Sequence, residues 1–263
     1  MPRKPSVLIT GASSGIGAVY ADRFARRGHD LVLVARDRAR MEKLGDRLRR
    51  ETGVTVNILQ ADLTDAGDLA LVEARLRDDS RIGILVNNAG MTAAGGFLDQ
   101  SADEVTRVVN LNAMALLRLA HAVAARFAEA GSGSIINISS VLALAPEYGA
   151  AVYGATKAFA LFLSQGLQVE LGPKGVYVQA VLPAATRTEI WERSGKDINK
   201  FPAVMEVDEL VDAALAGFDR REKVTIPPLP DEDQWTVFDA ARTAMIPNFN
   251  QAHAAARYRY VAA

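Results

Sequence analysis

Apolar residues occur in two patterns along this chain. Some form short unbroken or alternating runs, such as LVLVA, which are typical of buried strands in a parallel sheet. Elsewhere they recur every three or four positions, which is typical of amphipathic helices. Strands are therefore predicted at residues 7–10, 31–35, 54–63, 84–90, 135–138, 176–182 and 223–226. Helices are predicted at residues 16–27, 103–128, 153–171, 208–218 and 231–246.

The order of these elements indicates the fold. Strands alternate with helices, so we expect a doubly wound (Rossmann) parallel sheet of about seven strands with helices on both faces. No tract rich in Pro, Gly or Ser interrupts the chain, which predicts a single α/β domain over residues 1–263. In such sheets, ligands bind beyond the carboxyl ends of the strands. Residues at those ends are the first candidates for a site.

Two segments late in the chain have less regular patterns. Residues 187–205 carry large apolar side chains without a clear period, and we expect either a substrate lid or a segment that closes the core. From residue 248 the chain matches no motif. We expect this tail to pack on a neighbouring subunit or to cover the pocket.

The composition argues against several kinds of partner. The 30 basic and 31 acidic residues nearly cancel, which gives no reason to expect nucleic acid or an anionic membrane surface. There is no cysteine, and the three histidines lack partners at a ligand spacing, so we expect no disulfide and no metal. The opening MPRKPSVLITGASSGIG predicts neither a signal peptide nor a transmembrane span, and a cytoplasmic location is expected.

A glycine-rich loop, GASSGIG, lies between the first predicted strand and the first predicted helix. The backbone N–H groups of such a loop and the positive end of the helix dipole point toward the same place, where a pyrophosphate can bind. Glycines allow the phosphates to approach the backbone closely. The candidate cofactor-binding residues here are Gly11, Ser13, Ser14, Gly15, Ile16 and Gly17.

Arg36 follows the second predicted strand, about 20 positions after the loop. An acidic residue at this place binds the ribose 2′-hydroxyl of NAD, whereas an arginine accommodates the 2′-phosphate of NADP. Arg36 therefore favours NADP(H), with Ser13, Ser14 or Arg38 assisting. The adjacent Asp37 keeps NAD(H) as an alternative cofactor, and without a nucleotide role Arg36 would simply begin a solvated helix.

A tyrosine and a lysine are the main candidates for chemistry. Tyr153 and Lys157 are four residues apart in the predicted helix 153–171, so they share one face. A free phenol has a pKa of about 10, and a nearby ammonium would lower that pKa enough for proton exchange at neutral pH. Ser140 follows strand 135–138, which places its hydroxyl at the carboxyl end of the sheet. The alternative is a chance pair on an exposed helix face.

Together these motifs resemble the short-chain dehydrogenase/reductase family. The loop has the spacing TGxxxGxG, the fourth predicted strand ends in NNAG, and Ser140, Tyr153 and Lys157 follow in the family's order. The resemblance covers nearly the whole chain. It implies an NADP(H)-dependent oxidoreductase that transfers a hydride between the nicotinamide and a carbonyl or secondary alcohol substrate.

The resemblance also implies roles for particular residues. Tyr153 would be the general acid/base, Lys157 would lower its pKa and hold the ribose, and Ser140 would hydrogen-bond the substrate oxygen. Asn112, preferred to Asn110, would hold a water in a proton relay. The further cofactor-binding positions that it implies, beside Tyr153 and Lys157, are Asp62, Leu63, Asn88, Ala89, Gly90, Pro183 and Thr188.

One position departs from the family pattern. Ala184 stands where the family usually has a glycine after Pro183, which affects how closely the backbone approaches the nicotinamide carboxamide. The apolar stretch 141–148 would line the substrate cavity and favours an uncharged or partly apolar carbonyl compound.

We therefore expect a small-molecule carbonyl or alcohol substrate, no nucleic acid and no membrane. By resemblance, the protein would be a homodimer or homotetramer. Two other functions are considered: a 3-oxoacyl thioester reductase, and a non-catalytic NADP-binding sensor. The intact set of Ser140, Tyr153 and Lys157 disfavours the sensor.

Overall fold

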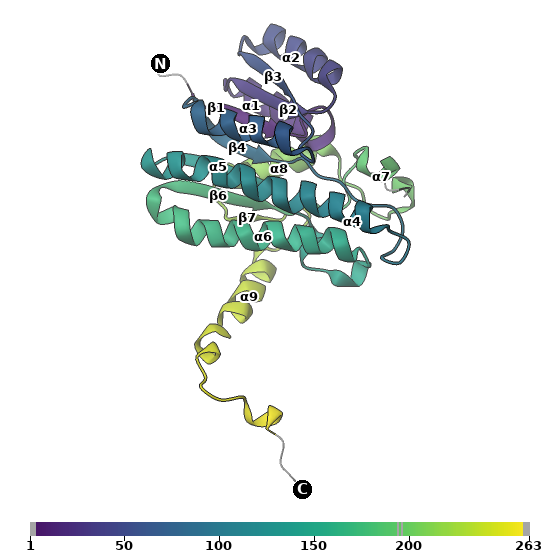
Figure 1. The fold of residues 1–263 in the computed structure, drawn as a ribbon, viewed down its shortest axis with the longest axis vertical. Helices are drawn as coiled ribbons and strands as arrows, with labels where there is room; N and C mark the ends of the chain where they lie inside the picture. Colours follow the sequence, from purple (N-terminus) through teal and green to yellow (C-terminus); the bar gives the residue numbers. More distant parts are fainter. Residues whose placement is uncertain (1–3, 194, 196, 260–263) are drawn as a thin grey trace. The chain divides into compact units, whose positions relative to one another are not determined.

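The computed structural model describes residues 4–193, 195 and 197–259. Within these residues, seven parallel strands form one sheet in the order β3-β2-β1-β4-β5-β6-β7 (Figure 1). The strands are β1 (Ser6–Thr10), β2 (Leu31–Ala35), β3 (Val56–Gln60), β4 (Ile82–Asn87), β5 (Gly133–Ile138), β6 (Val176–Val181) and β7 (Val224–Thr225). From β1 the chain adds β2 and β3 on one side and then returns to add β4 to β7 on the other, so the strand order reverses between β1 and β4. The predicted doubly wound sheet is confirmed.

Helices cover both faces of the sheet. One face packs against α1, α2 and α8, and the other against α3, α5 and α6. The α-helices are α1 (Gly15–Arg26), α2 (Arg38–Thr52), α3 (Ala66–Asp78), α4 (Ala102–Val109), α5 (Leu116–Glu129), α6 (Ala151–Leu171), α7 (Ile190–Arg193), α8 (Val207–Asp219) and α9 (Glu232–Thr243).

The middle positions of β1 and all positions of β2 are apolar because both faces of the sheet are covered. In β1, Val7 and Ile9 join the core cluster that contains Phe24 of α1. Leu8, between them, joins the opposite cluster, with Val123 of α5. All five side chains are fully or almost fully buried. This double burial explains why the sequence shows unbroken apolar runs rather than alternation.

The helix predicted over 103–128 is continuous, but its hydrogen-bonding pattern changes in the middle. It consists of α4, a π-helical turn at Asn110–Ala115, and α5. The apolar period cannot reveal such a turn, because one extra residue shifts the helix face only locally. π-Turns of this kind occur frequently at functional sites.

Two predicted strands end earlier than expected because side chains engage the backbone N–H groups that would have extended the ladder. The strand predicted at 54–63 is β3, which ends at Gln60; the N–H of Asp62 donates to the carboxylate of Asp68 at 2.8 Å. The strand predicted at 84–90 is β4, which ends at Asn87 because the next two N–H groups donate to a threonine hydroxyl.

The continuous helical segment Ala102–Glu129 is long and apolar enough to cross a membrane by length and composition alone. Nearly half of its apolar window is buried within the protein. Leu116, Leu119 and Val123 of this segment belong to the core of the sheet domain. A helix in the core of a globular protein can be as long and as apolar as a membrane span. Packing in the core therefore accounts for the apolar character of this segment.

Contacts divide the chain into two units, Met1–Pro227 and Pro228–Ala263. The first contains the whole sheet. The second contains α9 and two short 3-10 turns, and none of its described residues is buried. The helix predicted at 231–246 is present as α9, where the rings of Trp235 and Phe238 lie 5.5 Å apart. A single domain over 1–263 stays a prediction.

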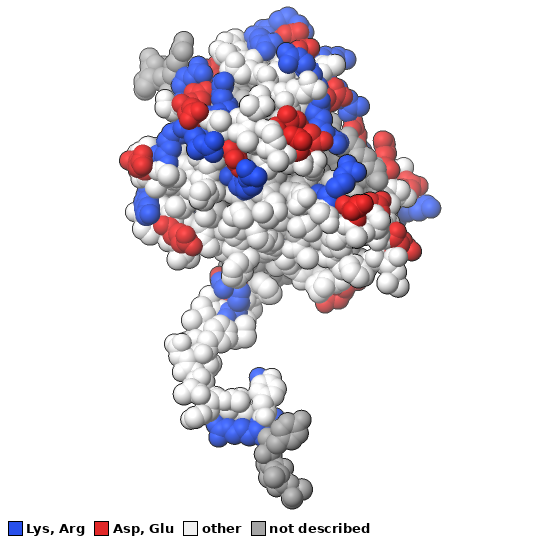
Figure 2. All heavy atoms as spheres, in the orientation of Figure 1, with Lys and Arg blue, Asp and Glu red and all other residues white. Residues whose placement is uncertain are grey.

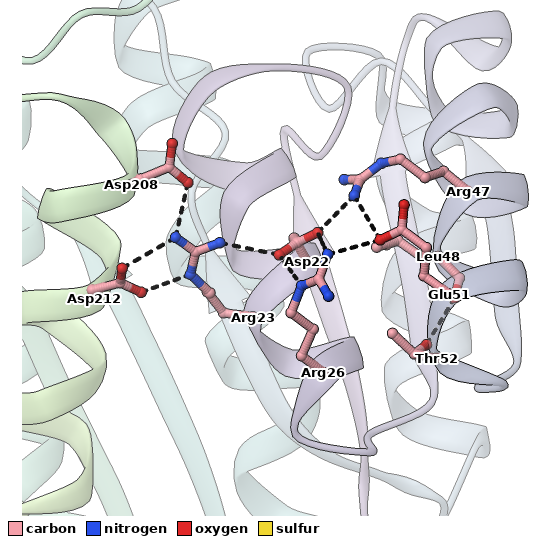
Figure 3. Close-up of polar contacts among 9 residues, drawn as sticks. All are labelled: Asp22, Arg23, Arg26, Arg47, Leu48, Glu51, Thr52, Asp208 and Asp212. Atoms are coloured by element: carbon pink, nitrogen blue, oxygen red, sulfur yellow. Dashed lines mark hydrogen bonds and ion pairs between the residues drawn. The ribbon is translucent and has the colours of Figure 1, made fainter.

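Asp22 on α1 is the centre of an ionic network (Figure 3). Its carboxylate accepts hydrogen bonds from Arg26 at 2.8 Å, Arg47 at 2.9 Å and Arg23 at 3.0 Å. Burial of the carboxylate raises its pKa, but the hydrogen bonds from the three arginines outweigh that effect and hold the pKa below its ordinary value. Asp22 thereby ties α1 to α2, which carries Arg47.

Arg23 extends the same network to α8. Its guanidinium binds Asp212 at 2.6 Å and Asp208 at 2.9 Å, while a third nitrogen binds Asp22 (Figure 3). The helices α1, α2 and α8 are therefore joined by charged contacts at the side of the apolar cluster that they share.

We expect Asp22→Asn to lower the free energy of unfolding at pH 7 by about 1–3 kcal/mol, since hydrogen bonds between charged groups are worth roughly this much when largely buried. Urea denaturation monitored by circular dichroism measures the change. Asp46→Asn is the matched control: Asp46 is 61% exposed and pairs with Arg49 at 2.6 Å. Its effect should stay below about 0.5 kcal/mol.

The pH dependence follows from the lowered pKa of Asp22. A carboxylate whose folded-state pKa lies below its unfolded value contributes stability above the unfolded pKa, about 4, and loses that contribution as pH falls through the folded-state pKa. The stability difference between the wild type and Asp22→Asn should therefore shrink below about pH 4. A difference that stays constant from pH 7 to pH 3 would argue against the ionic role.

Candidate active site

The glycine loop forms a tight cradle between β1 and α1. Gly11 and Gly15 have left-handed backbones, with φ of 66° and 53°. A Cβ on Gly17 would overlap the carbonyl oxygen of Gly11, and a Cβ on Gly11 would lie only 2.8 Å from the amide nitrogen of Asn88. Ser14, in extended conformation, is the residue that precedes α1. The helix N-terminus and the loop backbone can therefore approach an anionic ligand without side chains in between.

The end of β4 is attached to the end of β1 by one threonine. The Oγ1 of Thr10 accepts hydrogen bonds from the N–H groups of Asn88 at 2.9 Å and Ala89 at 3.0 Å. The Nδ2 of Asn88 donates back to the carbonyl oxygen of Thr10 at 2.8 Å. Asn88 and Ala89, predicted to border the cofactor ribose, thus lie beside the glycine loop, and Asn88 uses its side chain to hold that loop.

The next polar layer passes through the sheet. The Nδ2 of Asn87 donates to the side chain of Asn137 on β5 at 3.0 Å, and Asn137 donates to the hydroxyl of Ser164 on α6 at 2.9 Å. All three residues are buried. These contacts join β4, β5 and α6 beside the site.

Asn112 lies in the π-turn and is 1% exposed. Its amide binds both backbone groups of Met91: the Nδ2 donates to the carbonyl oxygen at 2.8 Å, and the Oδ1 accepts from the N–H at 2.9 Å. The Nδ2 also donates to the hydroxyl of Thr156 on α6 at 3.1 Å. Asn110, the alternative considered from the sequence, is exposed. The π-turn therefore directs Asn112, and not Asn110, toward the site.

Ser140 and Tyr153 meet at the carboxyl end of β5. The Oγ of Ser140 donates to the carbonyl oxygen of Pro183 at 3.3 Å and accepts from the N–H of Leu142 at 3.1 Å. A side-chain hydrogen bond also joins Ser140 to Tyr153. Ser140 is nearly buried, so its hydroxyl is held in one place by β5, by the loop after β6 and by α6.

Lys157 lies one helical turn beyond Tyr153 and is 5% exposed. Its Nζ donates to the carbonyl oxygen of Ile138 at 2.9 Å and lies 5.5 Å from the centre of the Tyr153 ring. A Cβ on Gly90 would be 3.5 Å from this Nζ and 3.4 Å from the Oδ1 of Asn112. The ends of β4 and β5 therefore converge on the lysine.

Burial dominates the titration of this pair. It raises the pKa of Tyr153 to about 12, although the hydrogen bond with Ser140 acts in the lowering direction. Burial lowers the pKa of Lys157 to about 8. The predicted lowering of the phenol pKa by Lys157 is not what this geometry gives, because burial outweighs the effects that favour the phenolate. At neutral pH the phenol is protonated and most of the lysine is charged.

A second group of predicted residues lies at the ends of β2 and β3. Arg36 lies 3.7 Å from the carboxylate of Asp62, which also accepts two hydrogen bonds from Thr64. Burial acts to raise the pKa of Asp62, but the Thr64 bonds and the nearby arginines lower it overall. Arg38 turns away and binds Glu42 at 2.7 Å. Arg36 is more than half exposed and can accept an anionic ligand.

Leu63 is nearly buried in the same core cluster as Leu69, so little of its side chain remains for a ligand to contact. Thr188, predicted from the loop after β6, lies over the glycine loop: a Cβ on Gly15 would be 3.3 Å from its methyl carbon. Pro183 contributes its carbonyl oxygen to Ser140. Thr188 therefore lies beside the glycine loop, and Pro183 lies beside Ser140.

The segment 187–205, the predicted lid, is closed at its base by backbone bonds. The N–H of Arg187 donates to the carbonyl oxygen of Met205 at 3.0 Å, and the N–H of Met205 donates to Ala185 at 2.9 Å. Within the segment, the rings of Trp191 and Phe201 are 4.6 Å apart. Residues 194 and 196 lie outside the described residues. A lid function stays a prediction.

Sequence reasoning missed four contributors. The hydroxyl of Ser139 donates to the carbonyl oxygen of Lys157 at 2.7 Å, and Thr156 binds Asn112. Arg40 on α2 binds Glu189 at 2.6 Å. The first two could have been suspected, since they adjoin Ser140 and Lys157. The last pair joins residues far apart in the sequence and leaves no local signal.

The family model described as "short chain dehydrogenase" matches residues 5–199. The chain belongs to the short-chain dehydrogenase family. This confirms the resemblance deduced from the glycine loop, NNAG and the Tyr153–Lys157 pair, and with it the prediction of a short-chain oxidoreductase.

Among solved structures, a short-chain dehydrogenase from Sphingobium yanoikuyae in complex with NADPH is 65% identical, with a TM-score of 0.96 over 97% of this chain and 100% of that one. A bulky-bulky ketone specific alcohol dehydrogenase from Comamonas testosteroni is 60% identical, with a TM-score of 0.92 over 98% of this chain and 100% of that one. Both members of the short-chain dehydrogenase family match this chain almost end to end.

Curated relatives in the family are more distant. Human 17-beta-hydroxysteroid dehydrogenase type 3 is 33% identical over 211 residues, which are 79% of this chain and 66% of that protein. Very-long-chain 3-oxoacyl-CoA reductase from Anas platyrhynchos is 30% identical over 198 residues, 73% of this chain and 63% of that protein. The chain thus spans about two thirds or less of the length of these two relatives.

Proposed function

We propose that this short-chain dehydrogenase is an NADP(H)-dependent carbonyl reductase, or reversible alcohol dehydrogenase, with Tyr153 as the general acid/base. The observation that carries the proposal is the convergence of Ser140, Tyr153 and Lys157 at the end of β5, beside Gly90 and next to the glycine loop. A proton donor, a hydroxyl and a cation close to one another are what such a reaction would require, and this supports the proposal.

The residues present fit a dinucleotide. Gly11, Gly15 and Gly17 leave the α1 N-terminus open to a pyrophosphate, and Thr188 would close over it. Lys157 and Gly90 would hold the nicotinamide ribose. When bound, the cofactor supplies or accepts the hydride, and the protein supplies orientation and proton transfer.

The pKa of each group suits the direction of carbonyl reduction. Because the pKa of Tyr153 is about 12, the phenol keeps its proton at neutral pH and can donate it to the substrate oxygen as that oxygen gains charge. The Lys157 ammonium, close to the ring face, stabilises the phenolate that remains. Ser140 donates a hydrogen bond to the substrate oxygen in place of its bond to Pro183.

Asn112 completes the proton path in this proposal. Its bonds to Met91 and Thr156 hold the π-turn against the strand ends near Lys157. In this position it would retain a water that returns a proton to the lysine and tyrosine.

NADP(H) is the preferred cofactor in this proposal. Arg36 and its exposed guanidinium would pair with the 2′-phosphate, and Asp62, 3.7 Å away, would keep the arginine in place. The 65% identical Sphingobium structure contains NADPH, which supports the assignment.

The substrate would be a ketone with two bulky substituents. The 60% identical Comamonas enzyme is described as specific for such ketones, and the stretch 141–148 next to Ser140 is mostly apolar. A 3-oxoacyl thioester reductase is the second candidate, because relatives with that activity are about 30% identical.

The remaining expectations concern location and assembly. Acidic and basic side chains are mixed in the upper part of the face drawn in Figure 2, which gives no electrostatic reason to propose a nucleic acid or an anionic membrane as partner. A homodimer or homotetramer is proposed because α6 exposes Phe162 and Val169, at 72% and 77%. A cytoplasmic location likewise stays a prediction.

We expect purified protein to oxidise NADPH with diaryl or other bulky ketones, and Tyr153→Phe to reduce kcat by about 10²- to 10⁴-fold, the range typical of a lost general acid. The assay follows NADPH absorbance over a panel of ketones, aldehydes and 3-oxoacyl thioesters. Tyr20→Phe, which removes the hydroxyl of a buried tyrosine on α1 that has no hydrogen-bond partner among the described residues, is the matched control. Equal loss in both variants, or full activity of Tyr153→Phe, would refute the assigned role.

The pH profile of reduction should depend on Lys157. Only the protonated lysine stabilises the phenolate, and its pKa is about 8, so kcat/KM for reduction should fall as pH rises through about 8. The measurement is the initial rate at limiting ketone between pH 6 and pH 10, with enzyme integrity checked after each assay. A rate of reduction that rises steadily to pH 10 would contradict the need for the ammonium.

Arg36→Asp should reverse the cofactor preference. The variant loses the partner of the 2′-phosphate and places a second carboxylate beside Asp62, so NADPH affinity should fall by about 10- to 100-fold while NADH affinity changes little. Fluorescence titration gives both dissociation constants. Lys43→Asp, the same charge change on the exposed side of α2, serves as the control. Unchanged NADPH affinity in Arg36→Asp would refute the assignment.

A further inference from the structure

The chain that leaves β6 crosses over the glycine loop before it reaches α7. We call residues 186–191 the strap. Its first residue, Thr186, is 4% exposed, and its carbonyl oxygen accepts a hydrogen bond from the indole of Trp191 at 2.7 Å. The middle of the strap is in contact with the loop, since Thr188 lies over Gly15. The strap therefore starts from a buried residue, is folded back on itself by the Trp191 bond, and rests on the proposed pyrophosphate site.

The strap has a second attachment, on α2. The guanidinium of Arg40 binds the carboxylate of Glu189 at 2.6 Å and also lies 3.4 Å from Asp37, the residue that caps α2. Asp37 in turn accepts the backbone N–H of Arg40 at 3.0 Å. Arg40 is therefore oriented from its own helix before it reaches across to the strap.

These contacts lie at two places beside the proposed phosphate-binding residues. The glycine loop lies under Thr188, and α2 begins two residues after Arg36. A chain segment held at both places must move before a dinucleotide beneath it can leave.

We propose that the Arg40–Glu189 ion pair is a latch that closes the strap over the bound dinucleotide and slows its release. This rests on the proposed function, because it requires that NADP(H) bind between the glycine loop and the strap. Arg40 acts through Glu189 and the strap, so it is a positioning residue. Since the two side chains are 51% and 37% exposed, the latch is weak: its loss should speed NADPH release by about two- to fivefold.

Stopped-flow fluorescence measures the test directly. NADPH bound to the protein is displaced by excess NADP⁺, and the dissociation rate is recorded for the wild type, Arg40→Gln, Glu189→Gln and the double variant. The latch predicts the same acceleration in both single variants and no further acceleration in the double variant. Exchanging the charges, Arg40→Glu with Glu189→Arg, should bring the rate back toward that of the wild type.

Two control variants each remove one charge, one basic and one acidic, from side chains of α2 that do not contact the strap. Lys43→Gln and Asp46→Asn should leave the dissociation rate unchanged. NADH separates the latch from a direct contact of Arg40 with the 2′-phosphate: the latch acts on the strap, so the variants should also release NADH faster.

The outcomes distinguish the two proposals. If Arg40→Gln accelerates only NADPH release and Glu189→Gln has no effect, Arg40 binds the phosphate itself and the latch is wrong. Unchanged rates in both single variants, with normal NADPH binding by the wild type, overturn the latch alone. A wild type that binds neither nucleotide overturns the proposed function and the latch together.

Discussion

The site depends on one hydroxyl group at the end of β1. The Oγ1 of Thr10 accepts hydrogen bonds from the N–H groups of both Asn88 and Ala89. These N–H groups are then not used for strand pairing, and β4 ends there. This happens between β1 and β4, where the strand order reverses and a crevice opens in doubly wound sheets. The glycine loop enters the crevice from one side and Gly90 from the other. An apolar side chain at position 10 would leave two N–H groups without their acceptor and would loosen both walls.

Burial then sets the chemistry of the groups that meet there. Tyr153 and Lys157 are shifted in opposite directions by the same cause, because desolvation disfavours a phenolate and an ammonium alike. The lysine is not left without a partner: its Nζ donates a hydrogen bond to the carbonyl oxygen of Ile138 at 2.9 Å. Tyr153 is thus neutral before the reaction, and the Lys157 ammonium is already in place beside it. A negative charge forms on the tyrosine only when its proton is transferred. Such preorganisation is more effective in a buried site than in water.

The sequence was sufficient for the order of the elements and for the residues at the strand ends. Unbroken apolar runs predicted the strands because both faces of the sheet are covered, and Ser140 and the glycine loop fall where those strands end. The ends of β3 and β4 were misjudged, since Asp68 and Thr10 accept N–H groups that a pattern assigns to the ladder. The π-turn was missed because it preserves the apolar period on either side. The raised pKa of Tyr153 required knowledge of burial, and the pairing of Arg40 with Glu189 required the fold.

The packing of α8 on α1, which the contacts of Arg23 with Asp208 and Asp212 reinforce, affects the chain while it is made on the ribosome. The helix α1 is made early, but one side of its apolar cluster is supplied by Val211, Ala214 and Leu215 of α8, near the end of the sheet domain. Until those residues emerge, Phe24 and its neighbours lack part of their cover. The nascent protein therefore carries an exposed apolar surface through most of translation, a state in which chains aggregate or require chaperones.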